Sequence, residues 1–286
     1  ERRRFATSCH MCKREGLVPV LDLGFHPHSD AFLREEQLNE SEATYPLRLV
    51  QCPKCGLLQI DYFVNPRILY QDDYLYQSST TETGRKHYTE MARGIRDRFA
   101  IQSGALAVDI GSNVGVLLSG FKEVGLKVLG VDPAQKIAEI ANKNGIETIV
   151  DFFSAAVGKS IRERYGAASV ITGTNVFAHL HDLDDAVAGM KFLLEESGVI
   201  VIEAPYALPL IKNLEYDTIY HQHIAYLSVR PMREYFLRVG LELFDVEEHS
   251  MHGGTLRYYV GNPGKHPVQK SVQKYLDGEE AFGLYT

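Results

Sequence analysis

Beyond residue 105 the chain alternates short apolar runs with stretches in which apolar residues recur every three or four positions. The short runs predict buried parallel strands, and the recurring pattern predicts amphipathic helices on both faces of the sheet. Strands are expected at residues 105–110, 127–133, 147–150, 168–175 and 198–205. Helices are expected from the first turn through about residue 123, at 134–144, at about 182–194 and near 230–239.

A hairpin closes this series. The runs "LELFDVEEH" and "GTLRYYVG" are separated by a short connection that contains glycine, which is a hairpin signal. Five strand–helix units with a terminal hairpin predict an α/β fold with a class I methyltransferase (Rossmann-like) sheet. A plain dinucleotide-binding fold more often continues with parallel units. Ahead of the sheet, "GRKHYTEMARGIRDRF" predicts an amphipathic helix that covers it and keeps its charges in solvent.

All four cysteines lie near the start of the chain, as two Cys-x2-Cys pairs: Cys9 and Cys12, then Cys52 and Cys55. Two such pairs bring four thiolates around one zinc ion, and four cysteine ligands leave no open position on the metal. Disulfides are the alternative, but no secretory signal precedes them. A redox site needs only one pair. The sequence therefore predicts a small N-terminal domain with a structural zinc ion.

A glycine turn, Gly111-Ser-Asn-Val-Gly115, follows the first strand of the sheet. A dinucleotide site needs G-x-G-x-x-G, and Asn113 occupies the second glycine position, so the turn has no clear seat for a pyrophosphate. S-adenosylmethionine (SAM), or its product S-adenosylhomocysteine, carries no phosphate and fits better than NAD. The residues expected to hold it are Gly111, Ser112, Asn113, Gly115, Asp132, Pro133, Asp151, Phe152, Phe153 and Asn175.

These residues follow successive strands. Asp132 ends the second strand, where a carboxylate accepts hydrogen bonds from both ribose hydroxyls. Asp151, Phe152 and Phe153 follow the third strand and are expected at the adenine, and Asn175 ends the fourth, beside the methionine moiety. Each of these acids, taken alone, has an alternative explanation as a helix cap or a turn residue.

The composition of the chain limits the classes of partner that it is expected to bind. The net charge of −7 argues against broad binding to nucleic acid or to anionic membranes. No apolar run approaches the roughly 20 residues that span a bilayer, and no hydrophobic segment follows the basic start. We therefore expect a cytoplasmic protein without nucleic-acid or membrane partners. The last residues, "EEAFGLYT", read as part of a helix, so we expect the natural chain to continue past Thr286; the oligomeric state is not indicated.

The segment "EYDTIYHQHIAY" places Tyr220, His221, Gln222 and His223 side by side after the fifth strand, at the rim where an acceptor would approach the cofactor. A carbon acceptor must lose a proton before it can take a methyl group, which requires a positioned base and a donor to the enolate oxygen. Histidine is the natural base near neutral pH. The alternatives are half of a metal site, completed by "HLH" at 179–181, or ordinary loop residues.

The chain resembles the zinc-containing sugar C-methyltransferases, which methylate C-3, and in some members C-5, of nucleotide-linked 4-keto deoxysugars or deoxyaminosugars. The resemblance covers nearly the whole chain and is carried by "CHMC…CPKCGLLQ", "DDYLYQSS", "VDIGSNVG", "NVFAHLHDLD", "IEAPY", "EYDTIYHQH" and "HGGTLRYYV". It implies that His223 is the base that removes the proton next to the ketone and that Tyr220 lies near the keto oxygen. His179 matches the histidine of "NVFAH".

The resemblance also implies an acceptor site. A tyrosine of the "DDYLYQSS" type lines the sugar pocket, which matches Tyr74, with Tyr76 as the second choice. His221 is a further candidate contact. In "HSMHGGTLR", His252 and Arg257 are either parts of a hairpin turn or contacts to the nucleotide diphosphate.

The chain departs from the family at Gln222, where glutamate is usual; a glutamine does not accept a proton or hold a charge, but its amide still hydrogen-bonds.

The predicted organisation is a zinc-binding domain (1–60), a tyrosine-rich connector and helix (61–104), a SAM-binding methyltransferase domain (105–262) and a tail (263–286) that begins a further domain. The predicted activity is C-methylation of a nucleotide-linked 4-keto deoxysugar. Two alternatives stay open: methylation of an oxygen or nitrogen acceptor, and a catalytically silent module that binds sugar nucleotides.

Overall fold

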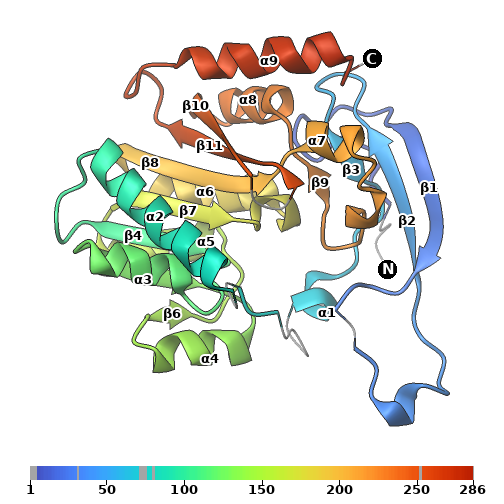
Figure 1. Ribbon diagram of the computed structural model, residues 1–286, viewed down its shortest axis with the longest axis horizontal. Coiled ribbons are helices and arrows are strands. Elements are labelled where there is room, and N and C mark those ends of the chain that lie inside the picture. Colours follow the sequence, from blue (N-terminus) through green and yellow to red (C-terminus); the bar gives the residue numbers. More distant parts are fainter. Residues whose placement is uncertain (1–4, 31, 71–75, 79–80, 251–252, 286) are drawn as a thin grey trace.

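The structure is a computed structural model and describes residues 5–30, 32–70, 76–78, 81–250 and 253–285. It contains a seven-stranded sheet and a four-stranded sheet, which stand side by side (Figure 1). The order of the larger sheet is β10-β11-β8-β7-β4-β5-β6. Its strands are β4 (Leu106–Ile110), β5 (Lys127–Val131), β6 (Thr148–Ile149), β7 (Ala168–Thr174), β8 (Leu194–Pro205), β10 (Glu242–His249) and β11 (Thr255–Gly261).

The larger sheet confirms the predicted fold class. Strands β4 to β8 pair in parallel, and β11 pairs antiparallel with both β8 and β10, which is the expected terminal hairpin. The observed bounds of several strands differ from the predicted ones. The third strand is reduced to two residues, because Val150 is about half exposed at the edge of the sheet. The fifth strand begins earlier than predicted, at Leu194, directly after the preceding helix.

Helices cover both faces of this sheet because its strands alternate their apolar side chains. Ala107, Val199 and Val201 pack with helices α2 and α3, whereas Val108 and Ile200 pack on the opposite side with α5, α6 and α8. The helices are α2 (Glu82–Arg98), α3 (Val116–Glu123), α4 (Gln135–Lys143), α5 (Ala155–Tyr165), α6 (Leu183–Leu193), α8 (Val229–Arg238) and α9 (Lys270–Phe282). Short helices are α1 (Pro66–Tyr70) and α7 (Ala207–Lys212), with 3₁₀ turns at Glu35–Gln37, Phe177–His179 and Tyr216–Thr218.

The smaller sheet has the order β1-β2-β3-β9 and is antiparallel throughout. Its strands are β1 (Val18–His26), β2 (Tyr45–Gln51), β3 (Leu58–Ile60) and β9 (Ala225–Tyr226). The last strand comes from the segment between β8 and α8, with Leu58 opposite Tyr226 in the register. The N-terminal sheet therefore takes its fourth strand from residues that follow the predicted Tyr/His cluster. The division of the chain into domains at 60, 104 and 262 stays a prediction.

The C-terminal helix α9 packs against α8 and β10 on the outer side of the molecule (Figure 1). The Glu279 carboxylate accepts hydrogen bonds from the backbone N–H groups of Val229 and Arg230 at the start of α8. Beyond α9, the carbonyl of Leu284 accepts a hydrogen bond from Gln51 at the end of β2 (2.7 Å). Residues 270–285 therefore connect the two sheets. None of the helices in the described part of the chain has the length and apolar composition needed to cross a membrane.

Candidate active site and metal centre

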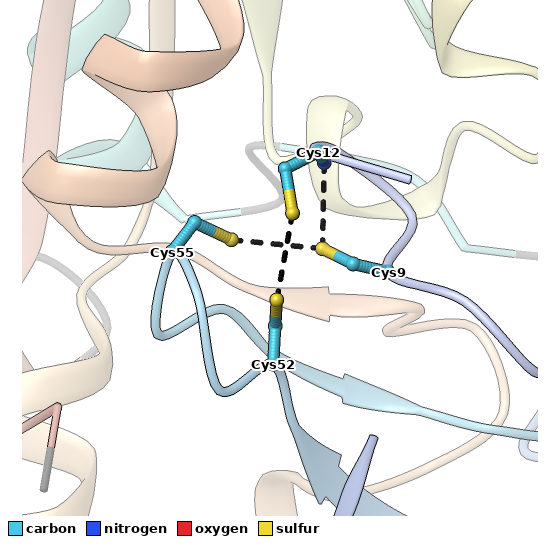
Figure 2. Close-up of side chains that lie close together, drawn as sticks. All are labelled: Cys9, Cys12, Cys52 and Cys55. Atoms are coloured by element: carbon cyan, nitrogen blue, oxygen red, sulfur yellow. Dashed lines mark hydrogen bonds between the residues drawn. The ribbon is translucent and has the colours of Figure 1, made fainter. Parts of the chain in front are cut away.

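The four cysteines converge on one point (Figure 2). Their sulfur atoms all lie within 4.8 Å of one another, with 3.6 Å between Cys9 and Cys55 and 3.5 Å between Cys12 and Cys52. Sulfur atoms bound about 2.3 Å from one zinc ion lie roughly 3.8 Å apart, whereas disulfide-bonded sulfurs lie about 2.05 Å apart. The distances match metal ligands, and the cysteines are free thiols. They are positioned to hold one metal ion with no open coordination position.

Gly56 shapes this centre. Its backbone has φ +79°, and its N–H donates to the carbonyl of Cys52 at 3.0 Å. A Cβ at this position would lie 2.1 Å from the ring of Tyr285. The glycine after the second cysteine pair therefore serves both the turn and the packing of the C-terminal segment on the metal centre.

A cavity of about 860 Å³ opens at the carboxyl ends of β4, β5 and β7, which is where ligands bind in open α/β sheets. Its wall contains eight of the ten residues predicted to hold a cofactor. These are Gly111, Ser112, Asn113, Asp132, Pro133, Phe152, Phe153 and Asn175. The same cavity is also lined by His179, Tyr220, Gln222 and His223, so both predicted sets share one space.

The glycine turn leaves room for a ligand at its backbone. Gly111 has φ +66°, and a Cβ there would lie 2.7 Å from Val176. Asn113 also has a positive φ. Its side chain holds residues 76–78 against the turn, because it accepts a hydrogen bond from the Ser78 N–H and donates one to the Tyr76 carbonyl. Gly115 does not line the cavity; it begins α3 with φ +81°, and a Cβ there would meet Ile146 at 2.9 Å. Its role is structural, which corrects the expectation for this residue.

Asp132 lies buried at the end of β5, with its carboxylate accepting from the backbone N–H groups of Asn113 (2.8 Å) and Ala134 (2.9 Å). Burial raises its pKa, and these two hydrogen bonds oppose that shift. Gly130 on β5 leaves room for the Ser112 side chain, because a Cβ at this position would clash with Ser112 Oγ.

Unsatisfied polar atoms at this wall indicate a polar ligand. Ser112 Oγ and Asn175 Oδ1 are buried and have no hydrogen-bond partner within the described part of the chain. Both residues line the cavity, and Asn175 is held there at φ +54°. This donor and acceptor set fits the hydroxyl and amino groups of a nucleoside cofactor.

Asp109 is a lining residue that the sequence reasoning missed. Burial raises the pKa of its carboxyl to about 7, partly opposed by the hydrogen bond from Thr172 Oγ1 (2.6 Å). An acid inside the apolar run "ALAVDIG" is the signal that would have identified it. Asp151, by contrast, is exposed outside the cavity and accepts from the backbone N–H of Phe152, which fits the turn-residue alternative. Its contact with the adenine stays a prediction.

The Tyr/His cluster forms a defined hydrogen-bonded pair. His223 Nδ1 lies 2.9 Å from the carbonyl of Thr218, and Nε2 lies 2.7 Å from the hydroxyl of Tyr220. Because a carbonyl only accepts, Nδ1 carries the proton of the neutral ring, and Nε2 is the basic nitrogen that accepts from Tyr220. Burial, and next the charge of Asp30, raise the pKa of Tyr220, so this hydroxyl stays protonated.

His179 faces the same pair, with its ring centre 5.0 Å from that of His223. Burial first, and then the neighbouring His223, hold the pKa of His179 well below its usual value, so the ring is neutral. His181 is held by the carbonyls of Val64 and His179. Within the described residues, the group positioned to bind a metal ion is the four cysteines rather than these histidines.

Two predicted acceptor contacts lie elsewhere. His221 is buried with Nε2 against the Pro46 carbonyl (3.2 Å), outside the cavity. Arg257 is also buried and outside the cavity; it pairs with Glu203 at 2.6 Å and lies 3.8 Å from Glu247. Neither side chain lines the cavity, and Nδ1 of His221 has no hydrogen-bond partner within the described part of the chain. The contacts of both residues with an acceptor stay predictions. Tyr76 lines the cavity and is about half exposed, whereas Tyr74 and His252 lie outside the described residues.

Comparisons with known proteins match this geometry. A family model for a zinc-binding domain matches residues 9–70, and a family model for a methyltransferase domain matches residues 84–246, which is more than half of the chain. The C-methyltransferase NovU of Streptomyces niveus is 32% identical over 277 residues, which cover 96% of this chain and 66% of that protein. The ubiquinone biosynthesis O-methyltransferase of Chromobacterium violaceum is 28% identical over 104 residues, or 36% of this chain and 45% of that protein.

Among solved structures, the plantazolicin methyltransferase BpumL in complex with SAH has a TM-score of 0.50 and 11% identity, covering 64% of this chain and 87% of that one. The plantazolicin methyltransferase BamL has the same TM-score at 14% identity, covering 64% and 86%. At these identities the likeness shows the fold of the larger sheet and its helices. Together with the family matches, it establishes that the chain belongs to the S-adenosylmethionine-dependent methyltransferases that carry an N-terminal zinc-binding domain.

Proposed function

We propose that this chain transfers the methyl group of SAM to a carbon next to the ketone of a nucleotide-linked 4-keto deoxysugar, with His223 as the base. The observation that carries the proposal is the His223–Tyr220 pair, in which the basic Nε2 faces a hydroxyl 2.7 Å away inside the cavity that also contains the cofactor residues. An imidazole with a defined tautomer and a phenol as hydrogen-bond donor are the two groups that formation of an enolate requires. The 32% identity to a C-methyltransferase supports the same class of acceptor.

In this proposal the cofactor is held by other residues of the same cavity. Asp132 would accept from the ribose hydroxyls, Phe152 and Phe153 would contact the adenine, and Asn175 would contact the methionine moiety; all four line the cavity. SAM, when bound, supplies the methyl group: the new carbon–carbon bond forms as the methyl–sulfur bond breaks, and its electron pair leaves with the sulfur.

The base and the donor are coupled by one hydrogen bond. His223 Nε2 accepts from Tyr220 in this structure, so proton abstraction requires the Tyr220 hydroxyl to turn to another acceptor. The ketone oxygen of the acceptor molecule offers that alternative. Its arrival would release Nε2 to take the α proton, while the hydroxyl donates to the oxygen that becomes negative. A tyrosine whose burial raises its pKa is suited to this task because it does not lose its own proton.

The charges on the wall limit how the acceptor enters. Among the described residues that line the cavity, seven are Asp or Glu and none is Lys or Arg. A diphosphate would meet only like charge there. We therefore place the keto sugar inside the cavity and its nucleotide diphosphate outside. We do not assign the diphosphate to Arg257, because this side chain is buried against Glu203.

The proposal is tested by proton exchange. A 4-keto deoxysugar nucleotide is incubated with the protein in heavy water without SAM, and deuterium at the carbon next to the ketone is followed by NMR. The wild-type chain should catalyse exchange, and His223→Ala should reduce the rate by at least about 100-fold. His26→Ala, an exposed histidine on β1, is the matched control and should exchange at the wild-type rate.

Three outcomes would contradict the proposal. Unchanged exchange in His223→Ala would remove this residue from the base role. A methylated product whose new methyl group is on oxygen or nitrogen would show a heteroatom acceptor. No exchange and no product across a panel of such nucleotides would favour a silent binding module.

A further inference from the structure

The acceptor side of the cavity contains a carboxylate that comes from the N-terminal, zinc-bearing part of the chain. Of the described residues among the first 60, Ser29 and Asp30 line the cavity. They follow β1, at the start of the segment that joins β1 to β2 and reaches past the sheet toward α1 (Figure 1). This segment brings the N-terminal module into contact with the reacting groups.

Asp30 has a backbone conformation that aspartate tolerates better than most residues do. Its φ is +62°, in the left-handed region that disfavours most side chains. Residues held in this way cluster at sites where a side chain must point in one direction. Here the side chain reaches the amide of Gln222, and Gln222 Nε2 donates to Asp30 Oδ2 at 3.1 Å.

Gln222 is nearly fully buried and lies between Tyr220 and His223 in the sequence. Its amide therefore links the carboxylate of Asp30 to the segment that carries the proposed base. The same carboxylate acts electrostatically on the Tyr220 hydroxyl, which is 2.7 Å from His223 Nε2. Asp30 and Gln222 thus form one hydrogen-bonded pair and Tyr220 and His223 another, and all four residues line the cavity.

We infer that Asp30 is a positioning residue for the proton transfer: its carboxylate, oriented by Gln222, provides the negative charge that stabilises His223 once this ring has taken the acceptor's proton. This inference rests on the proposed function. It also changes the interpretation of Gln222. A glutamine amide can donate a hydrogen bond to the carboxylate of Asp30, whereas an ionised glutamate at this position could not. A glutamate at 222 would place two carboxylates about 3 Å apart, and one of them would have to be protonated or move away.

The other groups around His223 do not provide this charge in the same position. Rings face it from His179, Tyr220 and Tyr226, and the ring of His179 is neutral. Other carboxylates on the cavity wall belong to Asp182, and to Glu215 and Asp217 beside the 3₁₀ turn whose Thr218 carbonyl holds Nδ1. Asp182 accepts from the backbone N–H of Asp185 (3.1 Å). Glu215 is engaged by the side-chain amide of Asn213 (2.8 Å). Asp30 is the carboxylate that a hydrogen bond connects to the segment 220–223.

A charge-exchange series tests the inference. Asp30→Asn keeps the shape of the side chain and tolerates the left-handed backbone, but it removes the charge. Gln222→Glu adds a charge next to an existing one. We expect each single change to reduce α-proton exchange by about tenfold or more. The double variant Asp30→Asn with Gln222→Glu restores one carboxylate and one amide and should return to within about threefold of the wild type. Asp22→Asn is the matched control and should leave the exchange rate unchanged. Asp22 is on β1, and its exposed carboxylate accepts a hydrogen bond from the backbone N–H of Gly24.

A second measurement needs no acceptor molecule. The titration of the His223 ring is followed by NMR on histidine-labelled protein, with His223→Ala to assign the signal. Loss of a nearby negative charge disfavours the imidazolium, so Asp30→Asn should move the titration midpoint down by about half a pH unit or more, whereas Asp22→Asn should leave it in place.

These two measurements separate the proposed role of Asp30 from a purely structural role. If Asp30→Asn leaves both the titration midpoint and the exchange rate unchanged, or if the double variant is no better than the worse single variant, the inference is wrong. If the wild type shows no exchange while its His223 midpoint depends on Asp30, the proposed function fails and the role of Asp30 as the counter-charge stands.

Discussion

The replacement of Arg257 by alanine tests the assignment of this residue to the interior rather than to substrate. Arg257 lies on β11 opposite Glu203 on β8 and opposite Glu247 on β10, so its guanidinium bridges three adjacent strands. The side chains of Arg257 and Glu203 are only 8% and 2% exposed. Removal of one partner from such a pair leaves a buried charge uncompensated, which costs about 3 to 5 kcal/mol.

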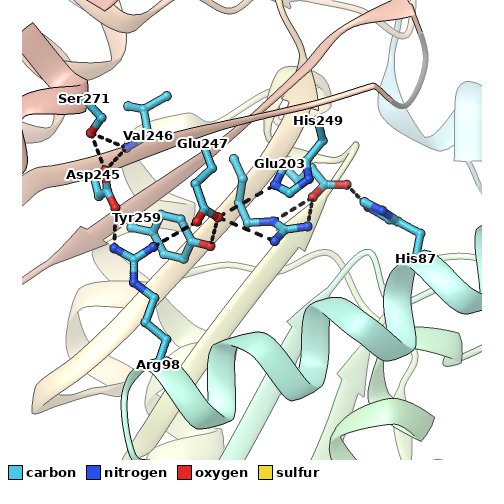
Figure 3. Close-up of polar contacts among 10 residues, drawn as sticks. His87, Arg98, Glu203, Asp245, Val246, Glu247, His249, Tyr259 and Ser271 are labelled. Carbon is cyan, nitrogen blue, oxygen red and sulfur yellow. Dashed lines mark hydrogen bonds and ion pairs between the residues drawn. The ribbon is translucent and has the colours of Figure 1, made fainter. Parts of the chain in front are cut away.

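Helix α2 makes the cost larger at this position. His87 Nε2 lies 2.6 Å from the second oxygen of Glu203, and Arg98 pairs with Asp245 and Glu247, so the charged side chains of α2 are anchored in the same network (Figure 3). A loss of 3 to 5 kcal/mol corresponds to a decrease in Tm of roughly 6 to 20 °C for a domain of this size. Urea unfolding followed by circular dichroism measures the loss directly.

The pH dependence of the stability provides a second measure, and the charges of this network determine its sign. Burial raises the pKa of the Glu203 carboxyl, but the hydrogen bond from His87 and the charge of Arg257 outweigh it, and the net pKa is lowered. In the wild type the Glu203 carboxylate therefore makes its full contribution to stability above the pKa of glutamate in the unfolded chain, about 4.3. This contribution is lost as the pH falls through the pKa of Glu203 in the folded protein. In Arg257→Ala the Glu203 carboxylate keeps only His87 as its partner, and protonation of this carboxylate on acidification should instead restore part of the lost stability.

Arg93→Ala is the control, because Arg93 pairs with Glu123 at 3.5 Å with both side chains more than half exposed; it should change the stability by less than about 1 kcal/mol. A loss below about 1 kcal/mol in Arg257→Ala would refute the reasoning from burial. Normal stability combined with weakened binding of the nucleotide sugar would return Arg257 to the role of a substrate contact.

Three further outcomes follow from the site. Cys52→Ser should abolish binding of one zinc ion per chain, measured by metal analysis, and should lower the Tm; full zinc content in this variant would exclude the cluster as the metal centre. Asp132→Asn should weaken binding of S-adenosylhomocysteine in calorimetry by about tenfold or more, because a charged acceptor is lost, and unchanged affinity would place the ribose elsewhere. Tyr220→Phe should reduce α-proton exchange by about 10- to 100-fold, and an unchanged rate would show that another group donates to the enolate oxygen.

The larger sheet was predictable because its information is local. Each strand is a short apolar run, each helix repeats every three to four residues, and the carboxyl ends of parallel strands meet at one edge. Gly111, Asp132 and Asn175 therefore reach the cavity as expected. The cysteine pairs were predictable for a similar reason, since their spacing alone brings four sulfurs together.

The smaller sheet and the partners of the catalytic segment were not predictable in this way. Strand β9 has two residues, and its pairing with β3 joins positions far apart in the sequence, which no periodicity records. Arg257 and His221 are polar residues whose burial depends on Glu203 and on the Pro46 carbonyl, both remote along the chain. The contact between Asp30 and Gln222 spans 192 positions and appears only once the two sheets are docked.

The shared strand has a consequence for protein engineering. Because β9 follows directly after His223 and completes the sheet of the cysteine-bearing module, the hydrogen bonds of that module help to hold the imidazole in place. A chimaera that grafts the first 60 residues of one relative onto the remainder of another would join mismatched halves of one sheet. Such an exchange should yield an active hybrid only when the stretch 216–227 travels with the graft.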